Sequence, residues 1–371
     1  MKVVLAFDKF KGSATAAQLN AAALDATDGH DGLQCVSVPV ADGGDGTAAV
    51  LAAPRDGQWI QLAVPAPLLQ LPPVNASYFL CDDGTALIEL AAASGLSLVP
   101  KHSLDVMRAT TLGTGLMMRD AMERGSRDIV LGLGGSATCD AAMGIMCALG
   151  AEFLDADDRH LYPCGGSLER IAQIRVEGIP QEVKDCHFTL LADVENTLSG
   201  EYGAARIYAP QKGASPQQVE QLDNGLRHVG RLAGEAIALK SGSGAAGGVP
   251  ALMLHLLDCD LVPGAPYVLQ RNGLVEAMAG ADLVITGEGR FDSQTLMGKG
   301  PGCVIKMARE HDIPVAVVCG VMDDGLDHQV AGIKQVVAVS DGLPVDEAMD
   351  TSGTLMRVTM AVQKLLRDFT R

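Results

Sequence analysis

The sequence predicts an α/β protein with two domains, one of them Rossmann-like with a parallel sheet. Short apolar runs that suit buried strands recur along the chain, for example at residues 3–7 and 283–285. Most of these runs lead into a polar, glycine-containing loop and then a helix, which is the repeating unit of a parallel sheet. The chain has 371 residues, whereas a single domain usually has ~100–200.

Composition excludes several classes of protein. The formal net charge is −17, from 45 acidic and 28 basic residues, so the basic surface of a nucleic-acid binder is not expected. The nine cysteines include no Cys-x-x-Cys pair, which argues against a zinc site and indicates a reducing compartment. No apolar run reaches the ~18–20 residues of a membrane span, and residues 3–7 are too few for a signal peptide. We expect a cytoplasmic monomer or homodimer with neither a nucleic-acid nor a membrane partner.

The first predicted strand, residues 3–7, leads into a loop that contains Lys11, Gly12 and Ser13. Ser13 is the expected N-cap of an alanine-rich helix at residues 14–26. Because free N–H groups and the helix dipole face such a loop, it is suited to bind an anion, and Lys11 would add a full charge. A plain turn with a solvated lysine explains Lys11 equally well.

The second predicted strand, residues 35–40, runs into the loop Ala-Asp-Gly-Gly-Asp-Gly-Thr at residues 41–47. Asp42 stands at the strand exit, where its carboxylate is placed to hold Mg²⁺ or a substrate hydroxyl. Aspartate is also common in turns. Of the two aspartates in this loop, Asp42 is the better candidate because Asp45 lies further from the strand.

Residues 281–295 combine a buried strand with a dense polar loop. Arg290 offers a planar fork of donors that suits phosphate or carboxylate. Glu288 and Asp292 are placed to bind a cation or to hold the arginine. A surface turn with an internal ion pair is the simpler alternative. Lys299 follows among glycines at the start of another helix and is a further candidate for phosphate.

The middle of the chain contains further polar loops after predicted strands. Ser136 and Thr138 follow a strand at residues 128–133, Asp193 follows one at 189–192, and Lys212 precedes a long helix. For that helix Ser215 is the expected N-cap and Gln218 the second member of a capping box.

One glycine pattern supports a competing function. Gly132, Gly134 and Ala137 fit the dinucleotide motif G-x-G-x-x-A, with Asp155 ~20 residues further on. Together they would indicate an NAD-dependent 2-hydroxy-acid dehydrogenase. The motif alone is weak evidence.

The similar acidic loops near both ends of the chain predict a discontinuous domain. We expect residues 1–58 and 283–371 to form the Rossmann-like domain and residues 59–282 to form an inserted α/β domain.

Taken together, the motifs resemble those of the bacterial glycerate kinases of the type that includes the galactarate and glyoxylate pathway enzymes. They occur in that family's order at residues 7–13, 39–47, 88–96, 132–138, 210–213, 244–248 and 285–295. The resemblance implies two unlike α/β domains with the active site in the cleft between them. It also implies transfer of the γ-phosphoryl group of ATP to D-glycerate with Mg²⁺, giving 2-phosphoglycerate in preference to 3-phosphoglycerate.

This chain departs from the family pattern inside candidate loops. The family usually has Asn-Asp-Gly-Gly where Cys139, Asp140, Ala141 and Ala142 stand, and it has other residues at Asp45 and Thr197. The altered loop at residues 139–142 is the support for a second alternative, a non-catalytic metabolite sensor on a kinase fold.

Our hypothesis for the site follows from the chemistry of phosphoryl transfer, in which positioning and charge neutralisation provide most of the catalysis. Arg290 clamps the carboxylate of glycerate, and Asp193 is the general base. Asp42 or Asp292 holds Mg²⁺ or the glycerate hydroxyls. The remaining candidates bind substrate or phosphate: Lys11, Ser13, Ser136, Thr138, Lys212, Glu288 and Lys299.

Overall fold

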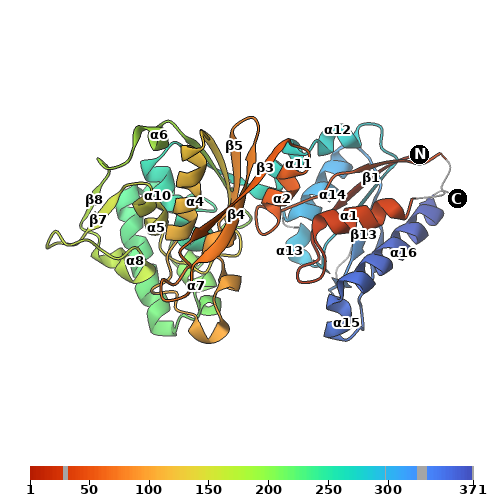
Figure 1. Ribbon diagram of the computed structural model, residues 1–371. Coiled ribbons are helices and arrows are strands. Elements are labelled where there is room, and N and C mark those ends of the chain that lie inside the picture. Colours follow the sequence, from red (N-terminus) through yellow and green to blue (C-terminus); the bar gives the residue numbers. More distant parts are fainter. Residues whose placement is uncertain (28–31, 297, 324–331, 370–371) are drawn as a thin grey trace. The chain divides into compact units, whose positions relative to one another are not determined.

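The chain forms two compact units in a computed structural model that describes residues 1–27, 32–296, 298–323 and 332–369 (Figure 1). The terminal unit comprises Met1–Asp42 and Ala265–Arg371, and the inserted unit comprises Gly43–Gly264. The boundaries predicted from the sequence are 58/59 and 282/283 instead. The difference at the first boundary arises because helix α2 (Thr47–Ala52) packs on strands of the inserted unit. At the second, Leu269 and Met278 belong to a core of the terminal unit.

The terminal unit contains a fully parallel five-stranded sheet with the order β15-β13-β11-β1-β2. Renumbered within the unit, this is the doubly wound order 2-1-3-4-5. Its two halves diverge between β1 and β11, so the topological switch point lies there. The five strands are β1 (Lys2–Phe7), β2 (Gln34–Ser37), β11 (Leu283–Gly287), β13 (Val315–Cys319) and β15 (Ile333–Ala338).

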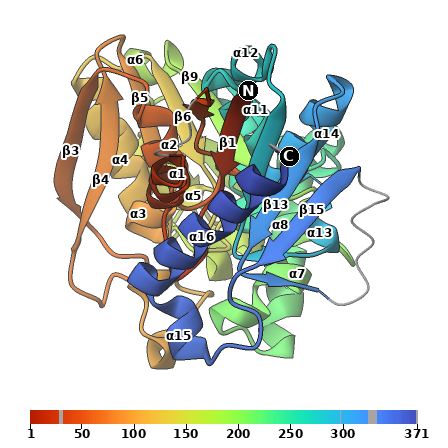
Figure 2. The ribbon, with the colours of Figure 1, turned by 90° about the vertical axis from the view of Figure 1, so that its right-hand side faces the viewer.

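Helices cover both faces of this sheet, which explains why its strands read as continuous apolar runs. Helices α1 (Ala16–Asp25) and α16 (Thr351–Phe369) pack side by side on one face, as Figure 2 shows. The other face is covered by α11 (Gly264–Arg271), α12 (Leu274–Met278) and α14 (Gly300–Glu310).

The inserted unit contains a mixed six-stranded sheet with the order β10-β9-β6-β5-β4-β3. The first four of these strands are parallel, and β4 and β3 continue the sheet as an antiparallel hairpin. The strands are β3 (Gly57–Val64), β4 (Val74–Cys81), β5 (Thr85–Glu89), β6 (Asp128–Gly132), β9 (His187–Ala192) and β10 (Cys259–Pro263).

The largest core of the chain lies wholly within the inserted unit. It is formed by one face of the sheet and by the helices α4 (Leu112–Glu123), α5 (Met143–Ala148), α8 (Pro216–Ala233) and α10 (Ala245–Leu256). Helix α8 begins as predicted, because the Ser215 and Gln218 side chains form the complete capping box. The prediction of two unlike α/β units, one of them with a parallel sheet, is confirmed.

The shorter elements connect these layers. They are α3 (Ala91–Ser94), β7 (Glu152–Leu154), β8 (Gln173–Arg175), α6 (Gln181–Lys184), α7 (Ala204–Tyr208), α9 (Glu235–Ala238), β12 (Arg290–Phe291), α13 (Ser293–Leu296), β14 (Val321–Met322) and α15 (Val345–Met349), with short 3-10 turns at Leu96–Leu98, Lys101–Ser103, Gly165–Arg170 and Pro210–Lys212.

The predicted N-cap of the first helix is wrong. The cap is Thr15, which forms a capping box with Gln18, and the helix begins at Ala16. Ser13 is still in the preceding turn, where the Phe10 and Ala14 backbones pair. Its hydroxyl donates to Thr354 Oγ1 at 2.7 Å, so it does not serve the helix.

Candidate functional site

Two acidic residues follow the strands that flank the switch point of the terminal unit. Asp8 comes directly after β1, and Glu288 comes directly after β11. The carboxyl ends of the strands at a switch point are where open α/β sheets bind ligands. The Asp8 side chain is buried, with 4% of the residue exposed, and its Oδ1 accepts a hydrogen bond from the Lys9 N–H at 2.6 Å.

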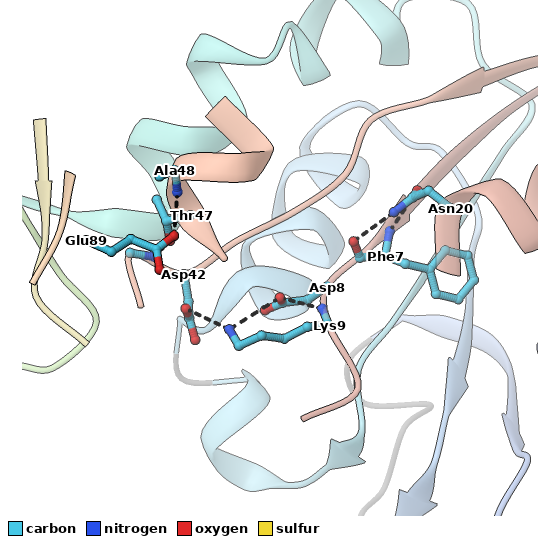
Figure 3. A network of polar contacts seen from close by, with 9 residues as sticks. Phe7, Asp8, Lys9, Asn20, Asp42, Thr47, Ala48 and Glu89 are labelled. Carbon is cyan, nitrogen blue, oxygen red and sulfur yellow. Dashed lines mark hydrogen bonds and ion pairs between the residues drawn. The ribbon is translucent and has the colours of Figure 1, made fainter. Parts of the chain in front are cut away.

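Lys9 lies between two carboxylates, as Figure 3 shows. Its Nζ is 3.3 Å from Asp42 Oδ1 and 3.7 Å from Asp8 Oδ1. Burial raises the pKa of Asp8 to about 7, the Lys9 ammonium opposes this shift, and the Asp42 carboxylate adds to it. A buried carboxyl group with a pKa near neutrality and a charged neighbour is typical of functional sites.

Glu288 extends this acidic group. Burial raises its pKa to about 7; the Thr295 hydroxyl and the Lys299 ammonium oppose the shift, and Asp8 adds to it. Its Oε1 is buried, and none of the described groups forms a hydrogen bond with it. An unsatisfied carboxylate oxygen beside other carboxylates suits a bound cation or a substrate hydroxyl.

Local structure explains how Asp8 is held. The buried Asn20 amide accepts from the Phe7 N–H at 3.3 Å and donates to the Phe7 carbonyl at 3.0 Å, which fixes the end of β1 to helix α1 (Figure 3). The first residue of α14, Gly300, lies so close that a Cβ there would be 3.1 Å from Asp8 Oδ2. Glycine therefore lets the N-terminus of a helix approach the Asp8 carboxylate.

Other predicted residues of the terminal unit are engaged elsewhere. Arg290 Nη2 pairs with Asp323 Oδ1 at 2.6 Å, and its side chain is largely exposed. Asp292 Oδ1 accepts from the Thr295 N–H at 3.0 Å and so closes a local turn. Lys11 is exposed, with its backbone next to Gly289, and Lys299 is the N-cap residue of α14.

In the inserted unit the structure brings together three predicted residues after β6. Lys212 is buried, and its Nζ donates to Ser136 Oγ and to the Thr138 carbonyl, both at 2.7 Å. Burial lowers the pKa of Lys212 to about 8. Thr138 Oγ1 is buried and has no hydrogen-bond partner among the described groups. An ammonium has three donors, and these contacts use two of them.

The loop after Thr138 is held in a strained conformation. Ala141 and Ala142 have φ values of 51° and 66°, in the left-handed region that favours glycine. The buried Asp140 carboxylate fixes them, because its Oδ2 accepts from the Thr111 N–H at 2.8 Å and from the Gly144 N–H at 3.2 Å. Backbone strain of this kind clusters at functional sites.

Two glycine-rich loops of the inserted unit pack backbone against backbone. A Cβ on Gly134 would lie 2.4 Å from the Gly44 Cα, and one on Gly132 would lie 2.9 Å from the Gly43 carbonyl oxygen. The glycines of the motif are thus needed for packing. Helix α2 begins beside them, where the Ala48 N–H donates to Glu89 Oε1 at 2.8 Å (Figure 3).

The dinucleotide reading of this motif does not fit the structure. The helix that follows Gly132 begins only at Met143, whereas a Rossmann fingerprint opens its helix directly. Asp155 lies next to the short antiparallel pair β7–β8, where it pairs with Arg170 at 2.9 Å. Asp155 is therefore not at the carboxyl end of a neighbouring parallel strand, which is where an acidic residue would bind the ribose of a dinucleotide.

Asp193 follows β9, and its side chain is exposed. It is close enough to Tyr208 to contribute to the raised pKa of that phenol, after the larger effect of burial. Tyr208 in turn donates to Asn196 Oδ1 at 2.6 Å. The loop around the predicted base is thus ordered by its own hydrogen bonds.

The acidic residues of the terminal unit supply the small number of carboxylates that a Mg²⁺ ion usually takes from a protein. Across the described ranges, no three His, Cys, Asp or Glu side chains converge in a way that would hold a metal ion by themselves. Mg²⁺ in phosphoryl-transfer enzymes usually takes one or two carboxylates and completes its shell with water and phosphate. Asp8 and Asp42 supply such a pair, on either side of the Lys9 ammonium.

Sequence reasoning missed Asp8, Lys9 and Asn20. Asp8 stands at a strand exit, which is the same signal that identifies Asp42 and Asp193. Nothing in the sequence pairs Asn20 with the end of β1.

A hollow of about 320 Å³ in the inserted unit, lined in part by Arg55, Trp59 and Phe79, contains none of the predicted site residues.

Comparison with known proteins gives consistent results. Residues 3–367 match the family model described as the glycerate kinase family. The chain is 40% identical to glycerate 2-kinase of Escherichia coli K12, over 94% of this chain and 93% of the relative. It is 36% identical to glycerate kinase of Bacillus subtilis 168, over 97% and 96% of the two chains.

A solved structure agrees with these relatives. It comes from Salmonella typhimurium LT2 and is provisionally named as glycerate kinase 2, with a TM-score of 0.86 and 34% identity over 100% of this chain and 98% of that one. None of the helices in the described part of the chain has the length and apolar character that a membrane crossing requires.

Proposed function

This chain belongs to the glycerate kinase family, and on that premise we propose that it transfers the γ-phosphoryl group of ATP to D-glycerate and releases 2-phosphoglycerate. Members of the family are phosphotransferases, so neither a dehydrogenase nor a sensor without catalysis is proposed. The observation that best supports the proposal is the charged group at the switch point of the terminal unit. There Asp8, Asp42 and Glu288 lie close to the cations Lys9 and Lys299.

This arrangement suits phosphoryl transfer. The transition state is loose, and the protein mainly has to position the reactants and balance their charge. We assign the holding of Mg²⁺ to Asp8 and Asp42, and Mg²⁺ when bound neutralises charge on the phosphate oxygens. Asp292 is a weaker candidate than the sequence indicates, because its Oδ1 already accepts from the Thr295 backbone.

Cationic side chains are proposed to bind the phosphates. Lys299, at the N-terminus of α14, adds its charge to that of the helix dipole. Lys11 is exposed, so its ammonium is accessible to a nucleotide. Lys212 orients Ser136 and the Thr138 carbonyl through two of its donors and keeps the third for a phosphate oxygen. Ser13 is also predicted from the sequence to bind substrate or phosphate, but its hydroxyl donates a hydrogen bond to Thr354 Oγ1.

The acceptor substrate requires a base and an anion clamp. We propose Asp193 as the proton acceptor for the attacking hydroxyl, since its carboxylate is exposed at a strand end. Arg290 is proposed to bind the glycerate carboxylate through its planar fork. Its pairing with Asp323 would have to loosen for this, so glycerate competes with an internal carboxylate.

The choice of 2-phosphoglycerate is supported by the name of the Escherichia coli relative, glycerate 2-kinase. A coupled assay tests both activity and product. The protein is mixed with ATP, Mg²⁺ and D-glycerate, and enolase is added without phosphoglycerate mutase. Because enolase acts only on the 2-phospho isomer, absorbance of phosphoenolpyruvate is expected to rise at once.

Two other outcomes are informative. A signal that appears only after phosphoglycerate mutase is added would identify 3-phosphoglycerate and overturn the proposed product. Absence of ADP release with D-glycerate, in a sample that is folded by circular dichroism, would overturn the proposed activity. L-glycerate and omission of Mg²⁺ serve as controls.

A further inference from the structure

Helices α15 and α16 expose an unusual number of large apolar side chains. The exposed fractions are 75% for Val345, 48% for Met349, 60% for Met356 and 61% for Met360. Helix α15 has no buried residue at all. Large contiguous apolar patches on the surface of a protein often mark sites of interaction with a partner.

These four side chains form two pairs, one on each helix, and we call the surface that they share the α15–α16 surface. Val345 and Met349 are four residues apart, as are Met356 and Met360, so each pair lies on one face of its helix. The opposite face of α16 is buried against the sheet. The exposed pair on α16 is therefore separate from the core of the unit. Methionine side chains are flexible and adapt well to a partner surface.

The two ends of the α15–α16 surface carry opposite charge. Asp346, Glu347 and Asp350 are exposed at the α15 end. Lys364 and Arg367 are exposed near the C-terminal end of α16, followed by one acidic residue, Asp368. Arg367 lies seven residues after Met360 and so on the same face of the helix.

We propose that this α15–α16 surface binds a second copy of the same chain, with the two α16 helices antiparallel about a two-fold axis. In such an isologous interface each surface contacts its own equivalent. Met356 and Met360 then meet near the axis. The acidic α15 end of each copy faces the basic α16 end of the other.

Charge complementarity favours a second copy over other occupants. Each chain carries a formal net charge of −17, so two copies repel unless their contact surfaces are locally balanced. The α15–α16 surface has this balance in the antiparallel arrangement, and a parallel arrangement would place like charges together.

The first test measures mass in solution. Sedimentation velocity of the full-length protein at ~1–50 µM, a range that detects Kd values of about micromolar size, is expected to show a dimer. The double variant Met356→Glu/Met360→Glu is expected to sediment as a monomer. Leu239→Glu is the matched control, because Leu239 is 65% exposed and apolar but lies in the inserted unit. It is expected to leave the dimer intact.

A charge-reversal pair tests the orientation. The variant Lys364→Glu/Arg367→Glu gives both ends the same sign, as does the variant Asp346→Lys/Glu347→Lys, so each alone is expected to be monomeric. In an equimolar mixture the two variants have complementary ends at both contacts of the dimer. The mixture is therefore expected to recover the dimer.

Three results would overturn the proposal. One is a wild-type protein that stays monomeric over the whole concentration range. The second is a dimer that Met356→Glu/Met360→Glu leaves unchanged, with the variant folded by circular dichroism. The third is a mixture of charge-reversed variants that remains monomeric, which would exclude the antiparallel pairing.

Discussion

Asp8 is proposed to hold Mg²⁺ and Asp193 to accept the proton of the attacking hydroxyl, and single substitutions distinguish these two roles. Asp193→Asn is expected to lower kcat by ~10²–10⁴ at saturating Mg²⁺, because the hydroxyl loses its proton acceptor. The Mg²⁺ concentration that gives half-maximal rate should stay unchanged. Steady-state kinetics with varied Mg²⁺ measures both quantities.

Asp8→Asn is expected to act on the metal instead. The half-maximal Mg²⁺ concentration should rise ~10–100-fold, which is the size of effect seen when residues around a metal site are altered. The buried amide retains the size of the carboxylate, so the fold should persist. If Asp8→Asn leaves the Mg²⁺ dependence unchanged, the assignment of metal binding to this residue is wrong.

The ammonium of Lys212 should make stability depend on pH. Burial lowers its pKa from an ordinary 10.5 to about 8, so between these values the unfolded chain binds more protons than the folded chain. The free energy of unfolding due to this group therefore rises as pH increases from 8 to 10.5. Below that window both states are protonated and the contribution is constant.

The comparison of wild type with Lys212→Met isolates this effect. Urea unfolding at several pH values between 7.5 and 10 should give a difference in unfolding free energy that changes with pH, because the other titrating groups cancel. Equal pH slopes for the two proteins would show that Lys212 is not charged and buried as described.

A single rule, that polar residues at strand exits are candidates for the site, selects Asp42, Glu288 and Asp193 from the sequence. The same rule applied to β1 would also have selected Asp8. The sequence cannot show that Arg290 pairs with Asp323, since that pairing depends on how β12 and β14 meet in space.

Among the helices, α8 has the N-terminus that the sequence predicts most clearly, because Ser215 and Gln218 form a capping box. Ser215 Oγ accepts from the Gln218 N–H, and Gln218 Oε1 accepts from the Ser215 N–H at 2.8 Å. Ser215→Ala is expected to destabilise the protein by about 0.5–2 kcal/mol because one helix N–H loses its partner.

Gln217→Ala is the control for this change. Gln217 is exposed in the same helical turn, so its replacement should alter the free energy of unfolding by less than ~0.5 kcal/mol. Urea unfolding measures both variants. Equal effects would mean that the capping box contributes nothing measurable.

The predicted capping box at Ser215 is confirmed, whereas the cap predicted at Ser13 is wrong, and the difference has a physical cause. Ser215 is followed by Pro216 and by an apolar stripe at helical spacing, so several local signals agree. After Ser13, Thr15 and Gln18 form a second local capping box, and the bond from Ser13 to Thr354 spans almost the whole chain. Local patterns alone do not decide between two such caps.

On the scale of the whole molecule, the sequence indicated a discontinuous arrangement but placed its boundaries later in the chain. Residues 43–58 contain α2, whose start is fixed by Glu89 in the inserted unit. Residues 265–282 contain α11 and α12, whose apolar side chains belong to the terminal unit. These helices look alike in sequence, and only long-range packing assigns each to its unit.

The boundaries at Gly43 and Gly264 lead to a prediction about independent folding. The inserted unit is one continuous segment, and the largest core lies entirely inside it. Expressed alone, Gly43–Gly264 is expected to unfold cooperatively on heating, because it has its own core and a complete sheet. It should not phosphorylate glycerate, since Asp8, Asp42 and Glu288 are absent from it.

A fragment cut at the boundaries read from the sequence, residues 59–282, provides the comparison. It lacks α2 and carries the apolar faces of α11 and α12 without the sheet that covers them. It is expected to melt at a lower temperature than Gly43–Gly264 and to aggregate more readily. Circular dichroism melting curves of both fragments measure this. Equal melting temperatures would show that α2 and Glu89 contribute little to the stability of the inserted unit.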